Sequence, residues 1–258
     1  MIDTHSHIYG PEYDEDRELV VQRAQQAGVE RLLLPNINEA SIQPMLSLCQ
    51  SYSGYCYPMF GLHPEDVSAD YLQVLGRMEE LLKAPSHPYI AIGEVGLDFY
   101  WDDSYRQQQI DAFSRQIEWA VQYKLPLMIH SRSAHTELVQ VIRQYASEGL
   151  SGVFHCFGGT LEEAQELLTF NNFFLGIGGV STFKKSPLPD VLRQIPLQRI
   201  VLETDSPYLS PVPYRVKRNE PSYVVEVMRK VAYIYNVSLQ EVEKVTNINV
   251  NRVFSRLK

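Results

Sequence analysis

Eight short apolar runs recur along this chain at fairly even intervals, and most of them are followed by a segment with the periodicity of a helix. The predicted strands are Ile2–His7, Arg31–Pro35, Tyr55–Phe60, Tyr89–Ile92, Leu127–His130, Gly152–Phe157, Phe173–Ile177 and Ile200–Thr204. The segments with apolar residues three and four apart are Asp16–Ala27, Tyr71–Leu82, Ser104–Tyr123, Thr136–Tyr145, Leu161–Phe170 and Leu188–Ile195. Because parallel strands need long crossover connections, this alternation predicts a parallel sheet covered on both faces.

A closed barrel is the architecture that this number of elements favours. Eight strand-helix units in 258 residues match the size of a (β/α)8 TIM barrel. An open doubly wound sheet normally has a glycine-rich turn after its first strand, but here His5-Ser6-His7 follows without one. No linker rich in Pro, Gly or Ser divides the chain. We therefore predict a single α/β domain over residues 1–258, ending in helices near Tyr223–Tyr235 and from Ser238 onward.

Charge and cysteine content exclude several classes of protein. The chain has 31 acidic and 23 basic side chains, a net charge of −8, which argues against a broad basic face that coats nucleic acid. Three cysteines are too few for a disulfide scaffold, so we expect a cytoplasmic protein. The longest uncharged segment, Ala40–Pro64, is interrupted by Ser, Gln and Pro, so we predict no membrane span. We also expect a monomer.

Side chains that can bind metal stand at the carboxyl ends of the apolar runs, the face on which barrel enzymes build active sites. His5 and His7 are two residues apart, so strand alternation points both to the same side. The other members of the set each follow a later run, and they are Glu94, His130, His155 and Asp205. We expect these six side chains to converge on one rim of the barrel.

Each of these residues also has an ordinary structural role as an alternative. A single histidine at a strand end is more often a core or capping hydrogen-bonding residue, and Asp205 before Ser206-Pro207 can cap a helix. That explanation is weaker for the whole set, because it leaves the shared placement of four histidines and two carboxylates to chance. Such a set suits Zn²⁺, Mn²⁺ or a similar cation better than Ca²⁺.

Six ligands are enough for one or two divalent cations, and a pair of cations has a definite chemistry. A carboxylate such as Glu94 can bridge two ions, and the ions lower the pKa of a bound water until it serves as hydroxide near neutral pH. Asp205 can hold an ion and also accept the proton of that water. A centre of this kind predicts hydrolysis of phosphoester or acyl bonds, with Glu94 and Asp205 as the catalytic carboxylates.

Several motifs together resemble one known family. They are His5-Ser-His7, Gly93-Glu94-Val-Gly96-Leu97-Asp98, Ile129-His130-Ser-Arg132, Phe154-His155-Cys156-Phe157, Leu202-Glu203-Thr204-Asp205-Ser206-Pro207-Tyr208-Leu209 and Arg218-Asn219-Glu220-Pro221. With these motifs the chain resembles the TatD family of metal-dependent hydrolases and deoxyribonucleases, which are amidohydrolase-type barrels, and within it the YjjV branch. The match runs from His5 to beyond Pro221, which is essentially the whole chain.

The resemblance implies how the ligands are divided between two cations of Zn, Mn or Mg. One ion would lie among His5, His7, Glu94 and Asp205, and the other among Glu94, His130 and His155. Glu94 would take the bridging place that related amidohydrolases fill with a modified lysine. The family includes nucleases that act on DNA, some of them as exonucleases releasing nucleotides from 3′ ends. Some members lack the first His-x-His pair, which this sequence retains.

Four further residues are candidates for substrate contact. His63, in Gly61-Leu-His63-Pro64-Glu65, matches the family's Gly-x-His-Pro element, and either touches a substrate phosphate or fixes its loop. Glu203 either accepts a hydrogen bond from a metal ligand or stabilises the loop. Arg132 and Arg218 follow the fifth and eighth runs and can meet phosphate oxygens, although a solvated loop is an equal alternative for Arg218.

Three functional hypotheses follow from these residues. The preferred one is a divalent-metal-dependent phosphodiesterase or deoxyribonuclease, acting at DNA ends or on another phosphodiester, with 3′–5′ exonuclease action as the specific form. The second keeps the metal centre but gives it a small ester, lactone or amide, since barrels change substrate through their loops. The third is a non-catalytic metal-binding protein, which the large ligand set disfavours because structural zinc sites are usually closed by four ligands.

Overall fold

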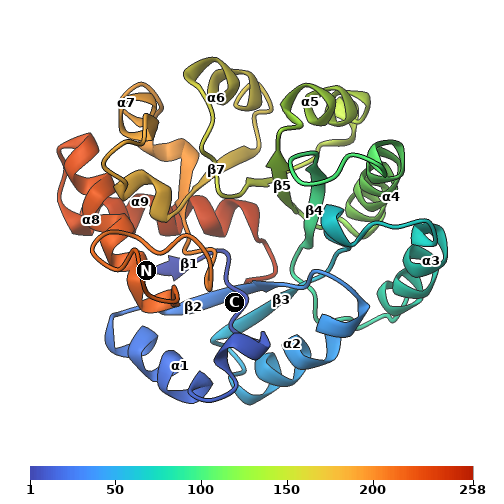
Figure 1. Cartoon of the computed structure of the whole chain (residues 1–258), viewed down its shortest axis with the longest axis horizontal. Helices are drawn as coiled ribbons and strands as arrows, with labels where there is room; N and C mark the ends of the chain where they lie inside the picture. Colours follow the sequence, from blue (N-terminus) through green and yellow to red (C-terminus); the bar gives the residue numbers. More distant parts are fainter. Residues whose placement is uncertain (258) are drawn as a thin grey trace.

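The computed structural model describes residues 1–257 and shows parallel strands arranged in a ring inside a ring of helices (Figure 1). The strands are β1 (Ile2–Asp3), β2 (Arg31–Pro35), β3 (Cys56–Met59), β4 (Ile92–Asp98), β5 (Leu127–Arg132), β6 (Gly152–Phe154), β7 (Phe173–Ile177) and β8 (Ile200–Leu202). Lys258, the last residue of the predicted domain, lies outside the described residues. The predicted α/β barrel is confirmed.

Closure of the ring depends on two seams between shorter sheets. Strands β1-β2-β3 form one parallel sheet and β4-β5-β6-β7-β8 form another. At the first seam the Phe60 N–H donates to the Ala91 carbonyl oxygen at 3.0 Å, which joins β3 to β4. At the second seam the Asp205 N–H donates to the His5 carbonyl oxygen at 2.9 Å, which joins β8 to β1. The second seam therefore lies among the predicted metal ligands.

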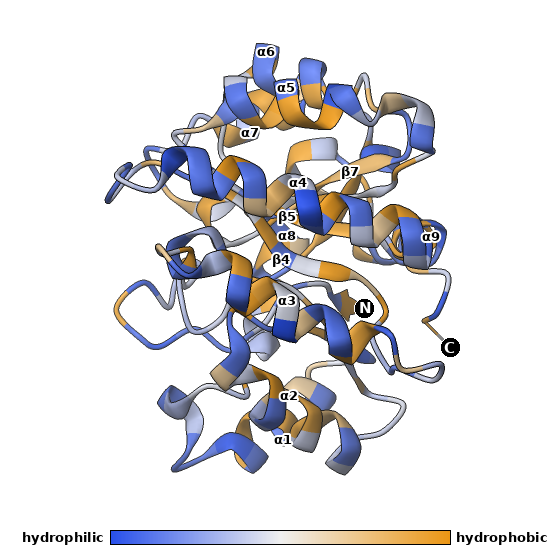
Figure 2. Cartoon of the chain, turned by 90° about the vertical axis from the view of Figure 1, so that its right-hand side faces the viewer, coloured by the Kyte–Doolittle hydropathy of each residue, from blue (hydrophilic) through white to orange (hydrophobic). Residues whose placement is uncertain are grey.

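Helices cover the outside of the barrel, and their apolar residues face the strands (Figure 2). They are α1 (Arg17–Gln26), α2 (Glu39–Ser51), α3 (Tyr71–Leu82), α4 (Arg106–Tyr123), α5 (His135–Gln144), α6 (Leu161–Leu167), α7 (Leu188–Leu192), α8 (Val224–Tyr235) and α9 (Leu239–Val253). The two predicted C-terminal helices are confirmed as α8 and α9, and Ser238 caps α9 by accepting a hydrogen bond from the Glu241 N–H. No helix in residues 1–257 is long and apolar enough to cross a membrane.

Strand alternation divides the core into two parts. On β2, Leu32 and Leu34 pack outward in the large cluster under the helices, whereas Leu33 packs in the barrel interior. Met128 on β5 belongs to the same interior cluster, which Phe254, just after α9, joins at the amino-terminal end of the strands. The apolar interior therefore fills one end of the barrel, and the polar residues further along each strand are left at the other end.

Close approach between strands requires glycine at two positions beside the site. A Cβ at Gly176 on β7 would lie 2.2 Å from Glu203 Oε2, so the missing side chain makes room for a buried carboxylate. A Cβ at Gly96 on β4 would lie 2.0 Å from the His130 carbonyl oxygen, and Gly96 has a φ of +140°. These glycines let β4, β5 and β7 carry larger side chains into the mouth of the barrel.

Several elements differ from the prediction: β1 ends at Asp3 instead of His7 and β6 at Phe154 instead of Phe157, so His5, His7 and His155 lie just after their strands. The fourth strand runs from Ile92 to Asp98 instead of ending at Ile92, so Glu94 lies inside a strand and not after one. Gly93 and Gly96 in this segment allow close packing against Met128 and His130 of β5. Helix α2 has no counterpart among the predicted segments, because Pro44 and several serines weaken its helical pattern. Its start is fixed by a capping box between Asn38 and Ser41.

Candidate metal centre

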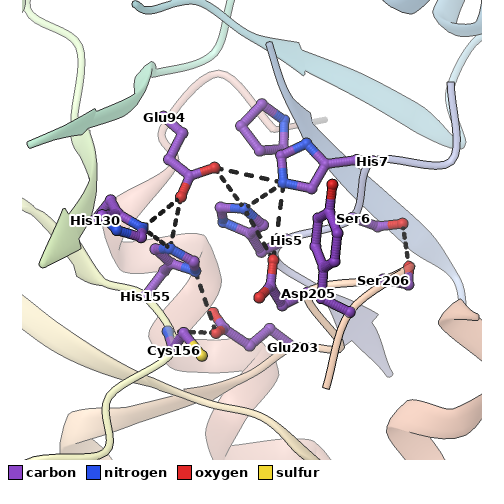
Figure 3. A network of polar contacts seen from close by, with 12 residues as sticks. His5, Ser6, His7, Glu94, His130, His155, Cys156, Glu203, Asp205 and Ser206 are labelled. Atoms are coloured by element: carbon purple, nitrogen blue, oxygen red, sulfur yellow. Dashed lines mark hydrogen bonds and ion pairs between the residues drawn. The ribbon is translucent and has the colours of Figure 1, made fainter. Parts of the chain in front are cut away.

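Glu94 stands at the centre of the rim, with one carboxylate oxygen toward each of two histidine sets (Figure 3). Its Oε2 lies 3.2 Å from His5 Nε2 and 3.4 Å from His7 Nε2. Its Oε1 lies 2.7 Å from His155 Nε2 and 3.0 Å from His130 Nδ1. Glu94 is buried. The carboxylate therefore has the position of a bridge between two groups of donor atoms.

The first donor group consists of His5, His7 and Asp205. The Nε2 atoms of the two histidines are 3.0 Å apart, and Asp205 Oδ1 lies 3.7 Å from the first and 3.8 Å from the second. The three ligand atoms are close enough together to hold one cation. Since His5 and His7 follow β1 and Asp205 follows β8, this group exists only because the second seam closes the barrel.

The second donor group consists of His130 and His155, and His63 lies beside it on the same oxygen of Glu94. The Nδ1 of His130 lies 3.2 Å from His155 Nε2, and the His63 Nε2 lies 3.3 Å from Glu94 Oε1. The His155 ring stacks on His5 of the first group at a centroid distance of 3.9 Å, so the two groups are adjacent. His63 also accepts a hydrogen bond at Nδ1 from the Glu65 N–H, which fixes its loop.

Two residues that the sequence analysis did not assign to the site determine which ring nitrogen of His7 and of His130 carries the proton. The Tyr9 hydroxyl donates to the Pro35 carbonyl oxygen at 2.6 Å and lies 2.9 Å from His7 Nδ1. It can therefore only accept from that nitrogen, which leaves the proton of a neutral His7 on Nδ1. Asp98 Oδ2 lies 2.8 Å from His130 Nε2 and holds the His130 proton there in the same way.

The tautomers of His7 and His130 show which nitrogen atoms are free to bind a cation. With their protons turned outward, His7 Nε2 and His130 Nδ1 present lone pairs toward the neighbouring imidazole nitrogens and the Glu94 oxygens. Lone pairs of nitrogen and carboxylate oxygen at about 3 Å repel, so either a cation or shared protons must lie among them; without a cation, Glu94 outweighs burial and raises the pKa of His155 well above its ordinary value. The donor set of imidazoles and carboxylates therefore fits divalent cations of the zinc or manganese type.

Burial sets the charge state of the donor side chains. Burial lowers the pKa of His5 well below its ordinary value, which keeps that imidazole neutral. Burial also opposes ionisation of Glu94, but the surrounding histidines, His155 foremost, outweigh it and hold the pKa of Glu94 well below its usual range. Burial, together with the charge of Glu94, raises the pKa of Asp205 to about 6. Asp205 is thus a carboxylate that can take up a proton near neutral pH.

The other predicted contact residues lie in three different settings. Glu203 is fully buried, accepts a hydrogen bond from the Cys156 N–H and lies 3.6 Å from His155 Nδ1, so it holds the chain that carries His155. Arg132 is exposed at the end of β5 and lines the cavity described next. Arg218 does not line it, because its guanidinium pairs with Asp16 at 2.7 and 2.8 Å.

A cavity of about 1300 Å³ opens above the donor groups. His7, Glu94, His130, His155 and Asp205 lie at its floor, and the loops after β4, β5, β6 and β8 contribute to its wall. This volume exceeds the range of roughly 300–1,000 Å³ that is typical of small-molecule pockets. The cavity therefore has room for more than the group that contacts the metal ligands.

We expect Asp98→Asn to weaken metal binding by about 10- to 100-fold, the usual effect of losing a carboxylate partner of a ligating histidine. Asp98 accepts from His130 through Oδ2 and from the Tyr100 N–H through Oδ1. An asparagine can accept at only one of these positions and must place its NH₂ group at the other. Metal titration against a chelating dye measures the change. Asp102→Asn, which removes a carboxylate from the same loop but outside the cavity lining, should leave the affinity unchanged.

Signals for Tyr9 and Asp98 were present in the sequence but needed the correct strand limits. Asp98 is four residues after Glu94, so both point to the same side once β4 is known to reach Asp98. Tyr9 is two residues after His7, and nothing in the sequence places its hydroxyl beside Pro35.

Comparisons with known proteins agree with this fold. Residues 2–255 match the family model described as TatD related DNase. The chain is 36% identical to the uncharacterized metal-dependent hydrolase YabD of Bacillus subtilis, with 98% of each chain covered. It is 31% identical to the 3′-5′ ssDNA/RNA exonuclease TatD of Erwinia tasmaniensis, covering 99% of this chain and 100% of the relative.

A solved structure gives the same result for the fold. The crystal structure of YjjV, a TatD homologue from Escherichia coli, superposes with a TM-score of 0.89 at 29% identity, covering 99% of this chain and 98% of that one. The likeness to YjjV that the motifs predict is thus confirmed in the fold. The chain belongs to the TatD family of metal-dependent hydrolases.

Proposed function

We propose that this chain hydrolyses phosphodiester bonds at the ends of single-stranded nucleic acid, as a 3′–5′ exonuclease that uses two divalent cations. The observation that carries the proposal is the position of Glu94, whose two oxygens face two separate histidine sets at the floor of a large cavity. Two-ion centres clamp the attacking and leaving oxygens of a phosphoryl displacement. A relative named as a 3′-5′ ssDNA/RNA exonuclease supports the substrate class and the polarity.

Each side chain of the centre has a role in this proposal. The first donor group would hold one cation of Zn, Mn or Mg, and the second group the other, with Glu94 shared between them. When bound, the cations supply positive charge for the phosphoryl oxygens and acidify water. Asp205, which lies beside His5 and His7 and lines the cavity, would take the proton of the attacking water. Glu203 keeps His155 in place by binding the adjacent backbone.

A small ester, lactone or amide is the second candidate substrate, and one observation favours it. Among the cavity-lining residues within the described chain, Arg132 is the one Arg or Lys, whereas several carboxylates line the wall. The negative charge of such a wall would repel a long phosphate backbone. It is compatible with a strand end that brings few phosphates, which is why we prefer the exonuclease.

Cellular setting and assembly follow from two further observations. Cys49, Cys56 and Cys156 are free thiols, which supports the cytoplasm as the compartment because reducing conditions keep such thiols unpaired. One chain supplies His5, His7, Glu94, His130, His155 and Asp205 within contact distance of one another, which supports a monomer.

The test uses a single-stranded 20-nucleotide DNA and its RNA counterpart, labelled at the 5′ end, with protein loaded with Mn²⁺, Mg²⁺ or Zn²⁺. We expect products that shorten one nucleotide at a time, none with a chelator, and none when the 3′ end is blocked. Lactones, amides and chromogenic phosphodiesters are assayed alongside by kcat/KM.

The possible outcomes separate the candidates. Shortening from the 5′ end would refute the polarity, and cleavage of lactones or amides in preference to phosphodiesters would replace the nuclease by the second candidate. If the fully metal-loaded protein left all these substrates intact, this result would support the third hypothesis, a non-catalytic metal-binding protein.

A further inference from the structure

Arg132 and two aromatic residues form a cluster beside the cavity, which we call the Arg132 cluster: Tyr100, Trp101 and Arg132, of which Trp101 and Arg132 line the cavity. The guanidinium carbon of Arg132 lies 3.7 Å from the centroid of the Tyr100 ring and 5.2 Å from that of Trp101. The two rings meet edge to face, with centroids 4.8 Å apart. The guanidinium is therefore held flat by stacking, which leaves its N–H edge available.

The cluster is joined to the metal centre and is otherwise unoccupied by protein partners. The Tyr100 N–H donates to Asp98, whose other oxygen contacts His130, so the loop is fixed at its start to the second donor group. Within residues 1–257 the Arg132 guanidinium has no hydrogen bond or ion pair, unlike Arg218, which Asp16 neutralises. Trp101 is 71% exposed although it lines the cavity. A free cation and a free indole face thus adjoin the proposed reaction site.

The charge of the remaining wall limits what this cluster can bind. Carboxylates that line the cavity away from the donor groups are Glu12, Glu65, Asp66, Glu137 and Glu163. Glu137 is paired with Arg106, but a polyanion that extended across the rest of this wall would meet like charges, so phosphates are best accommodated between the donor groups and Arg132. Binding of the rest of the substrate must then come from uncharged surface, and the exposed aromatic surface of the cluster supplies it.

We propose that the Arg132 cluster is a nucleotide-binding subsite that selects unpaired strand ends: Arg132 binds the phosphate next to the scissile one, and Trp101 stacks on a single unpaired base. A base within a duplex cannot offer its face in this way, because both faces are covered by neighbouring bases. The subsite therefore rests on the proposed nuclease function and deepens it, by assigning its preference for single strands to two residues of the loop after β4 and one at the end of β5.

The test is a double-change cycle, in which one group is removed from the protein and one from the substrate, separately and together. The kcat/KM of the metal-loaded wild type and of Trp101→Ala is measured on a single-stranded oligonucleotide and on copies with an abasic sugar at each of the last three positions. We expect Trp101→Ala to lose about 5- to 100-fold on the normal strand, chiefly through KM, as for other base-stacking aromatic residues. On the copy that lacks the stacked base, the two proteins should be equal. Tyr233→Ala removes a ring of similar exposure, 72%, from α8 and is the control.

A second measurement tests the phosphate contact. For a single strand, the logarithm of affinity falls with the logarithm of salt concentration by about 0.7 for each phosphate contacted. Arg132→Gln should reduce this slope in kcat/KM by about 0.7, while Arg143→Gln, on the outer helix α5 and paired with Glu166, should not change it.

The outcomes separate this subsite from the function on which it rests. A wild type that cleaves no nucleic acid refutes the proposed function and the subsite together. A wild type that degrades the strands, with Trp101→Ala equally impaired on every copy or impaired on none, refutes the base contact alone. An unchanged salt slope in Arg132→Gln refutes the phosphate contact.

Discussion

Glu94→Gln should lower kcat/KM by about 10³-fold or more and should release at least one of the two bound cations. An amide has one oxygen and one NH₂ group, so one donor group would face two hydrogens wherever the side chain turns. His5 and His7 contact one oxygen of Glu94, and His130 and His155 contact the other. Since metal ions contribute several kcal/mol of transition-state stabilisation, and 1.4 kcal/mol is a factor of ten, losing one ion accounts for this magnitude.

The measurement for Glu94→Gln combines elemental analysis with steady-state kinetics on the same preparation. We expect about one fewer ion per chain and little change in the circular dichroism spectrum, because the buried amide keeps the volume of the carboxyl. Glu162→Gln, an exposed position in the first turn of α6, provides the matched control and should retain both ions and full activity. Two ions bound to an active Glu94→Gln protein would show that this carboxylate is not the bridge.

Asp205→Asn is the second variant with a large expected effect, and it should lower kcat by about 10²- to 10⁴-fold, the range for losing a general base. The backbone at Asp205 has a φ of +56°, a conformation that asparagine adopts more readily than most residues. The hydrogen bond from its N–H to the His5 carbonyl oxygen does not involve the side chain. The variant should therefore fold with the same seam between β8 and β1.

Metal saturation separates the two roles of Asp205. As a ligand, it affects the concentration of metal needed, which a titration of activity with Mn²⁺ measures. As the proton acceptor, it affects kcat even when metal is saturating. We expect the loss in kcat to persist at saturation, with KM changed only a few-fold. Recovery of kcat to within tenfold of the wild type would assign Asp205 to metal binding alone.

The fold and most of the centre were predictable because one physical rule places both. In a parallel barrel all strands end on the same side, so polar residues after apolar runs must meet, and His130 and His155 do so two residues beyond the interior residues Met128 and Val153. Asp98 was missed because the fourth strand was predicted to end at Ile92, and only its pairing with β5 shows that it continues through two glycines to Asp98.

Other features depended on contacts between distant segments, which a sequence pattern does not contain. Arg218 was a reasonable phosphate ligand by its position after β8, but Asp16, about 200 residues earlier, pairs with it and turns it from the cavity. His63 had two alternative roles, loop fixing and substrate contact. Its ring supplies a loop contact through Nδ1 and faces Glu94 through Nε2. Its role toward a substrate stays a prediction.

The seam between β1 and β8 has a consequence for synthesis of the protein. His5 and His7 leave the ribosome early, but Asp205 follows 200 residues later, and Ser6 pairs with Ser206 across the same interval. At about 5 to 20 residues per second, this interval corresponds to roughly 10 to 40 s of translation. During that time the first donor group lacks its carboxylate and the barrel is open. Until Asp205 has been synthesised, a nascent chain therefore lacks one carboxylate of the proposed metal centre.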